Sequence, residues 1–94
     1  MKLFVMIAVA SIAFVAAGAA SAQEALAKSS GCLNCHAIDT KKVGPAFKDV
    51  AAKYKGQPDA AAKLAAEISA GKSHPPVKAS ADDVQSLVKW VLSL

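Results

Sequence analysis

The chain of 94 residues contains no arginine, and all eleven of its basic residues are lysines. Nucleic-acid and phosphate sites favour the bidentate guanidinium group, so we expect no nucleic-acid partner. Aromatic residues make up only 5% of the chain, and no alternation of polar and apolar residues predicts a strand. Alanine and lysine are abundant, which favours helices. The sequence therefore predicts one small all-α domain.

Cysteine and methionine are also scarce, with two of each. Cys32 and Cys35 allow at most one disulfide. A chain this short buries little apolar surface and usually needs a disulfide framework, a metal or a cofactor for stability. Both methionines, Met1 and Met6, lie in an N-terminal apolar segment. The scarcity of cysteine therefore predicts that a bound metal or cofactor stabilises the fold.

The N-terminal segment is typical of a secretory signal peptide. Residues 3–17 are almost wholly apolar, and Ala20-Ser21-Ala22 is a good cleavage site. We expect residues 1–22 to be removed, which leaves a mature domain of residues 23–94 in the periplasm. An uncleaved membrane anchor is the alternative, because the apolar run approaches spanning length. The mature charge would be 10 − 7 = +3, since the signal contains one lysine and no acid.

Helix signals divide the mature domain into four segments. Three of them are bounded by proline, glycine or small residues and cover Glu24–Ser30, Ala46–Tyr54 and Asp59–Ala70. The last follows Ser80, a good N-cap, and has acidic residues in its first turn. One apolar face is predicted from the spacing of Val84, Leu87, Val88 and Val91.

The sequence Cys32-Leu33-Asn34-Cys35-His36 has the C-x-x-C-H spacing of covalent haem attachment. On a helical turn, positions i, i+3 and i+4 share a face, so both thiols and the imidazole can meet one flat ligand. A redox disulfide, a zinc site that includes His74 and a structural disulfide are alternatives. The first lacks a βαβ pattern, and the second lacks a usual zinc spacing. The motif predicts one covalently bound haem c.

Residues 31–54 and 82–94 resemble the small bacterial monohaem class I cytochromes c, the cytochrome c-551/c-552 group. The resemblance implies about four helices wrapped around one haem, with the first and last packed together. It also implies that Cys32 and Cys35 attach the haem and that His36 is the proximal iron ligand. The carbonyl of Pro45 would accept a hydrogen bond from that imidazole, which would orient it.

One position departs from this family. The usual sixth ligand is a methionine followed by proline, but here His74 precedes two prolines, and residues 23–94 contain no methionine. We expect His74 to bind the iron and to lower its potential relative to His/Met haem. An open or water-bound iron, and ligation by Lys72 or Lys78, are the alternatives. Val77 stands where many members have an asparagine near the axial ligand, so the contact of that asparagine with the ligand is lost.

Two functions are compatible with these residues. The first is a monomeric electron carrier without catalytic residues, whose partners are periplasmic or membrane-bound redox proteins. A set of lysines would guide docking by long-range attraction: Lys41, Lys42, Lys48 and Lys55. The second is an open-site haem protein that binds a gas or peroxide, for which His74 is the only distal acid or base. The sixth ligand of the iron distinguishes the two.

Overall fold

The computed structural model describes residues 12–94, with side chains described from residue 18 onward. Four α-helices and one short 3-10 helix make up the regular structure: α1 Ile12–Ser29, η1 Cys32–Asn34, α2 Phe47–Lys53, α3 Ala60–Ala70 and α4 Ala81–Leu92. No strand occurs within residues 12–94. The predicted all-α class with about four helices is therefore confirmed.

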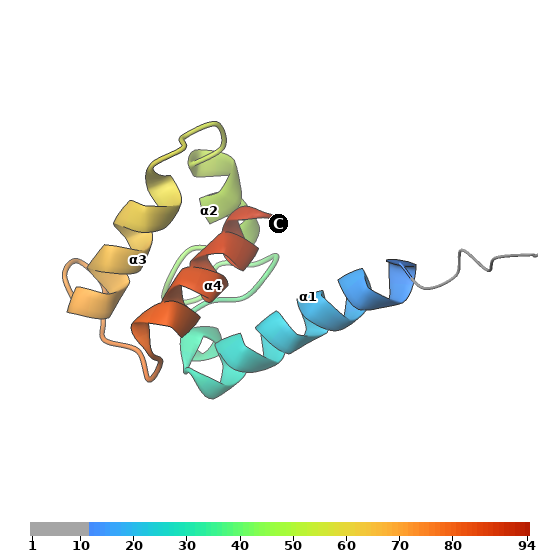
Figure 1. Ribbon diagram of the computed structural model, residues 1–94. Coiled ribbons are helices and arrows are strands. Elements are labelled where there is room, and N and C mark those ends of the chain that lie inside the picture. The colour runs from blue at the N-terminus through green and yellow to red at the C-terminus, as the bar shows by residue number, and fades with distance from the viewer. Residues whose placement is uncertain (1–11) are drawn as a thin grey trace, which may run out of the picture.

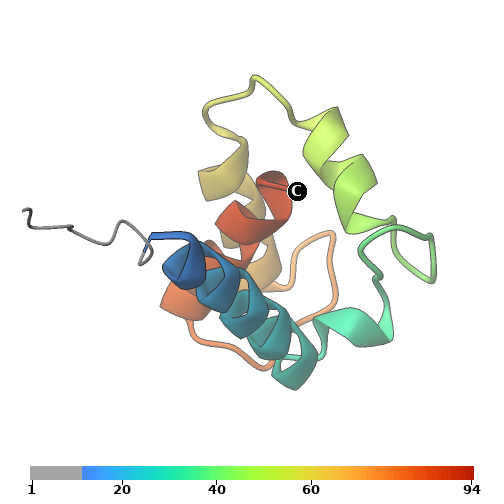
Figure 2. The ribbon, with the colours of Figure 1, turned by 90° about the vertical axis from the view of Figure 1, so that its right-hand side faces the viewer.

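Helix α4 is the centre of the fold and packs against α1, α2 and α3 (Figures 1 and 2). It starts where predicted, since the Ser80 side chain accepts a hydrogen bond from the backbone N–H of Asp83 at 3.2 Å. Its face of Val84, Leu87 and Val88 is buried. The packing of the first helix across the last, which the resemblance implies, is present between α1 and α4 (Figure 1).

The core between α3 and α4 is built from small and branched side chains. Ala65, Val84 and Val88 form its buried centre, and further apolar residues pack on them: Ala61, Leu64, Ile68, Val77, Ala79 and Leu92. Buried alanines let the two helices approach closely. The buried centre of this core thus contains only alanine and valine side chains. Such a small core fits the expectation that a cofactor completes it.

Helix α1 is the element whose start was predicted wrongly. The expected helix begins at Glu24, whereas the observed one begins at Ile12. The reason is compositional: residues 12–22 are rich in alanine and contain no proline, so the helix continues into the segment that we interpret as the signal peptide. The predicted cleavage point after Ala22 lies inside α1 and stays a prediction. The rest of that segment, residues 1–11, lies outside the described residues.

The other helix boundaries agree with the predictions to within one residue. Helix α2 begins and ends one residue inside the predicted 46–54, and α3 begins one residue after Asp59. Helix α3 ends at Gly71, whose φ of 67° is the left-handed cap expected of a C-terminal glycine. Among residues 12–94, no helix combines the length and apolar character needed to cross a membrane.

Candidate cofactor site

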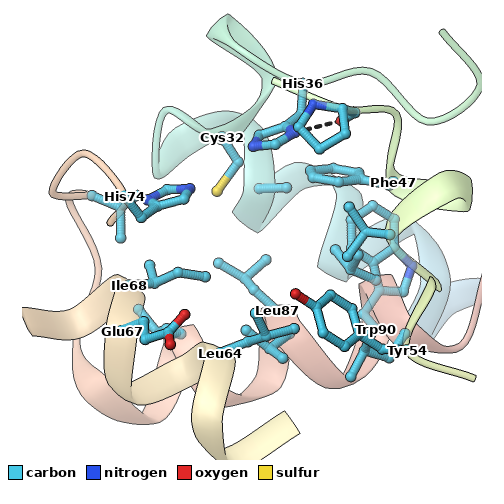
Figure 3. Close-up of a pocket in the computed structure, with 18 of the residues that line it drawn as sticks. Cys32, His36, Phe47, Tyr54, Leu64, Glu67, Ile68, His74, Leu87 and Trp90 are labelled. Carbon is cyan, nitrogen blue, oxygen red and sulfur yellow. Dashed lines mark hydrogen bonds between the residues drawn. The ribbon is translucent and has the colours of Figure 1, made fainter. Parts of the chain in front are cut away.

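A cavity of about 540 Å³ opens between the helices (Figure 3). Residues from α1, η1, α2, α3, α4 and the loop before α4 line it, and most of their side chains are apolar. Its volume falls within the range of about 300–1,000 Å³ that is usual for small-molecule and cofactor sites. Cys32, His36 and His74 line the cavity together. The fold therefore brings predicted site residues from distant parts of the chain to one cofactor-sized space.

The turn that contains the cysteines is tighter than the α-helical turn expected. Gly31, with φ 87°, ends the preceding helix and leads into the 3-10 helix Cys32–Asn34. The Cys32 carbonyl accepts hydrogen bonds from the backbone N–H groups of Cys35 at 3.3 Å and His36 at 3.0 Å. Cys32 and His36 face the cavity, whereas Cys35 is half-buried and is not among the residues that line it.

Both cysteines are free thiols in this structure. Burial raises the pKa of the Cys32 thiol, and a backbone hydrogen bond offsets part of this effect. Cys32 is therefore a neutral thiol at neutral pH, in an apolar setting. Within residues 12–94, no three His, Cys, Asp or Glu side chains are grouped closely enough to hold a metal ion. The arrangement required by the zinc alternative is not formed by the described residues.

The His36 imidazole is held from three sides. Its Nδ1 lies 2.6 Å from the carbonyl oxygen of Pro45, and its ring stacks on Phe47 with centroids 5.0 Å apart. Gly44 lies directly against the ring and leaves no room for a Cβ. A carbonyl oxygen only accepts, so Nδ1 must donate, and in the neutral ring Nε2 then has the free lone pair. His36 thus presents a metal-binding nitrogen in a fixed orientation.

His74 lies across the cavity from His36 (Figure 3). The two imidazole planes are within 4° of parallel, and their centroids are 6.1 Å apart. The Nδ1 of His74 lies 2.7 Å from the Pro75 carbonyl oxygen, so this nitrogen also donates and Nε2 again has the free lone pair. The Cys32 thiol points into the space between the two rings (Figure 3). Two candidate ligands therefore face one position beside a thiol.

The lysines considered in the sequence analysis lie elsewhere. Neither Lys72 nor Lys78 is among the described residues that line the cavity. The four expected docking lysines are all exposed. Two of them are already engaged, since Lys48 forms an ion pair with Asp39 at 2.7 Å and Lys42 donates to the Leu33 carbonyl at 3.1 Å.

Comparisons with known proteins agree with this geometry. The family model described as cytochrome c matches residues 15–94. The chain is 53% identical over 77 residues to cytochrome c-551 of Pseudomonas aeruginosa, covering 74% of each chain. It is 43% identical over 93 residues to cytochrome c-552 of Nitrosomonas europaea, covering 90% of each. The crystal structure of wild-type Nitrosomonas europaea cytochrome c552 superposes with a TM-score of 0.70 at 44% identity, covering 76% of this chain and 98% of that one.

The chain belongs to the cytochrome c family. It is a small class I monohaem cytochrome, and its cofactor is one covalently bound haem c. The cavity of this cytochrome fits such a group, because it combines an apolar lining with a thiol and an imidazole from the C-x-x-C-H turn. Bound haem supplies an iron that gains and loses one electron. As a member of this family, the protein is an electron-transfer cytochrome.

Several residues of the cytochrome site were not singled out from the sequence. Phe47 is 5% exposed and contacts Trp90 edge to face, with centroids 5.8 Å apart, so Trp90 supports the ring on which His36 stacks. Tyr54 and Glu67 also line the cavity, and both are half-buried (Figure 3). Gly44, Phe47 and Tyr54 lie within residues 31–54 and Trp90 within 82–94, the segments that resemble the family, but nothing in the sequence indicates their contacts.

Proposed function

We propose that this cytochrome c is a periplasmic single-electron carrier whose haem iron is bound by two histidines, His36 and His74. Cys32 and Cys35 form the thioethers, and Pro45 orients His36 through the hydrogen bond to Nδ1. The protein transfers electrons between redox proteins and is not itself an enzyme. The observation that supports this best is the parallel pair of imidazoles across the cavity.

The separation of the two rings suits one metal ion between them. A bond from imidazole to a first-row metal is about 2 Å long, so two such bonds and two ring radii add up to about 6 Å. The centroids of His36 and His74 are 6.1 Å apart. Each ring uses Nδ1 for a backbone carbonyl, so that Nε2 is available to the metal. These contacts support bis-histidine ligation over ligation by water or lysine.

The proposed ligands have a consequence for the potential. Methionine as an axial ligand raises the potential of c-type haem, and residues 23–94 contain none. An imidazole in its place donates more strongly and stabilises the ferric state. The protein would therefore accept electrons from stronger reductants than His/Met relatives do. Its partners are redox proteins of the same compartment, which we expect it to meet through short-lived encounters.

Ligation is tested with the full chain matured in a periplasm. The ferric protein should give the low-spin EPR and near-infrared magnetic circular dichroism signals of two nitrogen ligands. His74→Ala should convert it to a high-spin or water-bound form. Lys72→Ala and Lys78→Ala are matched controls in the same loop and should leave the spectra unchanged. A high-spin spectrum of the unmodified protein would contradict the proposal.

Export is tested on the same preparation. The mass of protein from the periplasmic fraction should equal that of residues 23–94 plus one haem. Replacing Ala22 by a bulky residue, in Ala22→Phe, should block processing after this position. A periplasmic protein that retains residues 1–22 would instead support the membrane-anchor alternative.

A further inference from the structure

The two histidines that face the cavity differ greatly in how firmly they are held. His36 is fixed by the Pro45 carbonyl, by the face of Phe47 and by the close approach of Gly44. The segment around it is tied down as well, because the Gly44 N–H donates to the Cys35 carbonyl at 2.7 Å and the Phe47 N–H to the Ala37 carbonyl at 2.9 Å. The proximal ligand therefore cannot leave its place without breaking several contacts.

His74 lies on a loop with far fewer restraints. Residues 72–78 are tied at their ends, where the Lys72 N–H donates to Glu67 at 3.0 Å and the Lys78 N–H to Ser30 at 3.4 Å. Between these ends, in the described part of the chain, no backbone hydrogen bond links residues 73–77 to another segment. The one hydrogen bond of the His74 side chain is to the adjacent Pro75 and moves with the loop. Of the five loop residues 72–76, all except the half-buried His74 are exposed.

The backbone beside His74 is also strained. Ser73 has a φ of 60°, and it is the only residue other than glycine with a positive φ among those described. A non-glycine residue is disfavoured in this conformation, because its Cβ comes too close to the following carbonyl oxygen. Ser73 itself lines the cavity. The unfavoured conformation therefore lies directly beside the proposed ligand, in the segment that must move if His74 leaves the cavity.

We propose that His74 is an exchangeable ligand, and that the reduced protein binds a neutral diatomic gas in its place. In the exchange, the bond between the His74 Nε2 and the iron breaks and one between the gas and the iron forms. The lone pair returns to Nε2, and no electron is transferred. The mainly apolar lining of the cavity favours a neutral ligand over an anion. This inference rests on the proposed function, since it requires His74 to be the resting ligand.

The apparent affinity for the gas then depends on the fraction of molecules in which His74 is released, because only these molecules can bind the gas. We expect release of His74 to relieve the strain at Ser73 and so to increase this fraction. Ser73→Gly removes the strain and should weaken apparent binding of carbon monoxide about fivefold. Ser73→Ala keeps a Cβ in the left-handed region and should change binding by no more than about twofold. The pair separates an effect of the backbone from loss of the hydroxyl.

The experiment uses the matured, dithionite-reduced full protein and carbon monoxide as the probe. The resting ferrous spectrum should be six-coordinate and low-spin. On mixing, it should convert to the carbon monoxide form at a rate that levels off as the gas concentration rises, because release of His74 becomes limiting. His74→Ala should bind without such a limit.

Three further outcomes decide against the inference. A low-spin protein that shows no spectral change at saturating carbon monoxide, while His74→Ala binds it, overturns the exchange and leaves the bis-histidine carrier intact. A resting spectrum that is already high-spin overturns both, since there is then no sixth ligand to displace. Equal binding by Ser73→Gly and the unmodified protein overturns the part assigned to strain.

Discussion

Gly44 lies so close to the His36 ring that a Cβ at residue 44 would stand 2.8 Å from Nδ1 and 2.9 Å from Nε2. Real Cβ atoms essentially never approach other atoms within 3.0 Å. The neighbours in conflict are ring atoms already fixed by Pro45 and Phe47, so the ring cannot yield freely. The side chain missing from Gly44 is therefore a condition for the position of the proximal imidazole.

We predict that Gly44→Ala displaces His36 and destabilises the protein by about 2–3 kcal/mol, the cost of overpacking a closely packed site. Denaturant unfolding and the ferric absorption spectrum measure the two effects. Gly56→Ala is a useful control, because Gly56 has a φ of 79° but no atom within 4 Å of the added Cβ. It should lower stability through backbone strain alone and leave the spectrum unchanged. An unchanged spectrum of Gly44→Ala would contradict the prediction.

The Phe47 ring lies between two other rings. It stacks on His36 and contacts Trp90 edge to face. Phe47→Ala removes a nearly buried ring and should lower the free energy of unfolding by about 3–5 kcal/mol. Phe47→Leu keeps much of the volume and should cost less than half as much. Thermal unfolding of the two variants, followed by the absorption of the haem, provides the comparison. Equal losses would mean that the contact between the rings matters and not the filled volume.

His74→Met tests the proposed cause of a low potential. A thioether in place of the imidazole should raise the midpoint potential, because methionine ligation favours the ferrous state. Lys72→Met places the same side chain two residues earlier in the loop, where it does not line the cavity, and should leave the potential unchanged. Spectroelectrochemical titration of both variants gives the result. A rise in both would point to the loop in general and would argue against His74 as the ligand.

Glu67 is the half-buried carboxylate of the cavity wall (Figure 3). A negative charge near the cofactor stabilises the ferric state by about 1 kcal/mol at the effective dielectric constant of a partly buried site. Glu67→Gln should therefore shift the ratio of ferric to ferrous protein about fivefold toward ferrous. Glu24→Gln, an exposed change on α1, should shift it much less. The test is redox titration at two salt concentrations, since only the exposed charge is strongly screened.

Ser80 caps α4 through the hydrogen bond to the Asp83 N–H. Ser80→Ala should lower the free energy of unfolding by about 1 kcal/mol without any effect on the haem spectrum. Ser86, an exposed residue within the same helix, provides the control. Ser86→Ala should be neutral or slightly stabilising, because alanine is the better helix former. Loss of stability in Ser86→Ala equal to that in Ser80→Ala would exclude the cap as the cause.

Much of the fold could be predicted because local signals and tertiary packing agree. Ser80 and Gly71 mark helix ends by the chemistry of capping, and the structure places both where expected. The start of α1 could not be predicted in the same way. Residues 12–22 and the start of the mature domain are both rich in alanine, and no proline or other helix-ending residue separates them at the predicted cleavage site.

The residues of the candidate site could be predicted only where a sequence motif or the family resemblance identifies them. Cys32, Cys35 and His36 follow from one motif, and His74 follows from the resemblance together with the lack of methionine. The stacking of Phe47 on His36 and the close approach of Gly44 depend on how the loop folds back, which no spacing encodes. Glu67 reaches the cavity because α3 packs on α4, a long-range arrangement that a periodic pattern does not specify.

The separation of the two histidines in the sequence also predicts an order in which their sites form during folding. Cys32, His36, Pro45 and Phe47 all lie in one short stretch, residues 32–47, so their contacts form with little loss of loop-closure entropy. His74 comes from beyond α2 and α3, so bringing it to these residues closes a longer stretch of chain. A chain that is still largely unfolded can thus present its thiols and proximal imidazole together. We therefore expect the distal loop to close after the proximal site has formed.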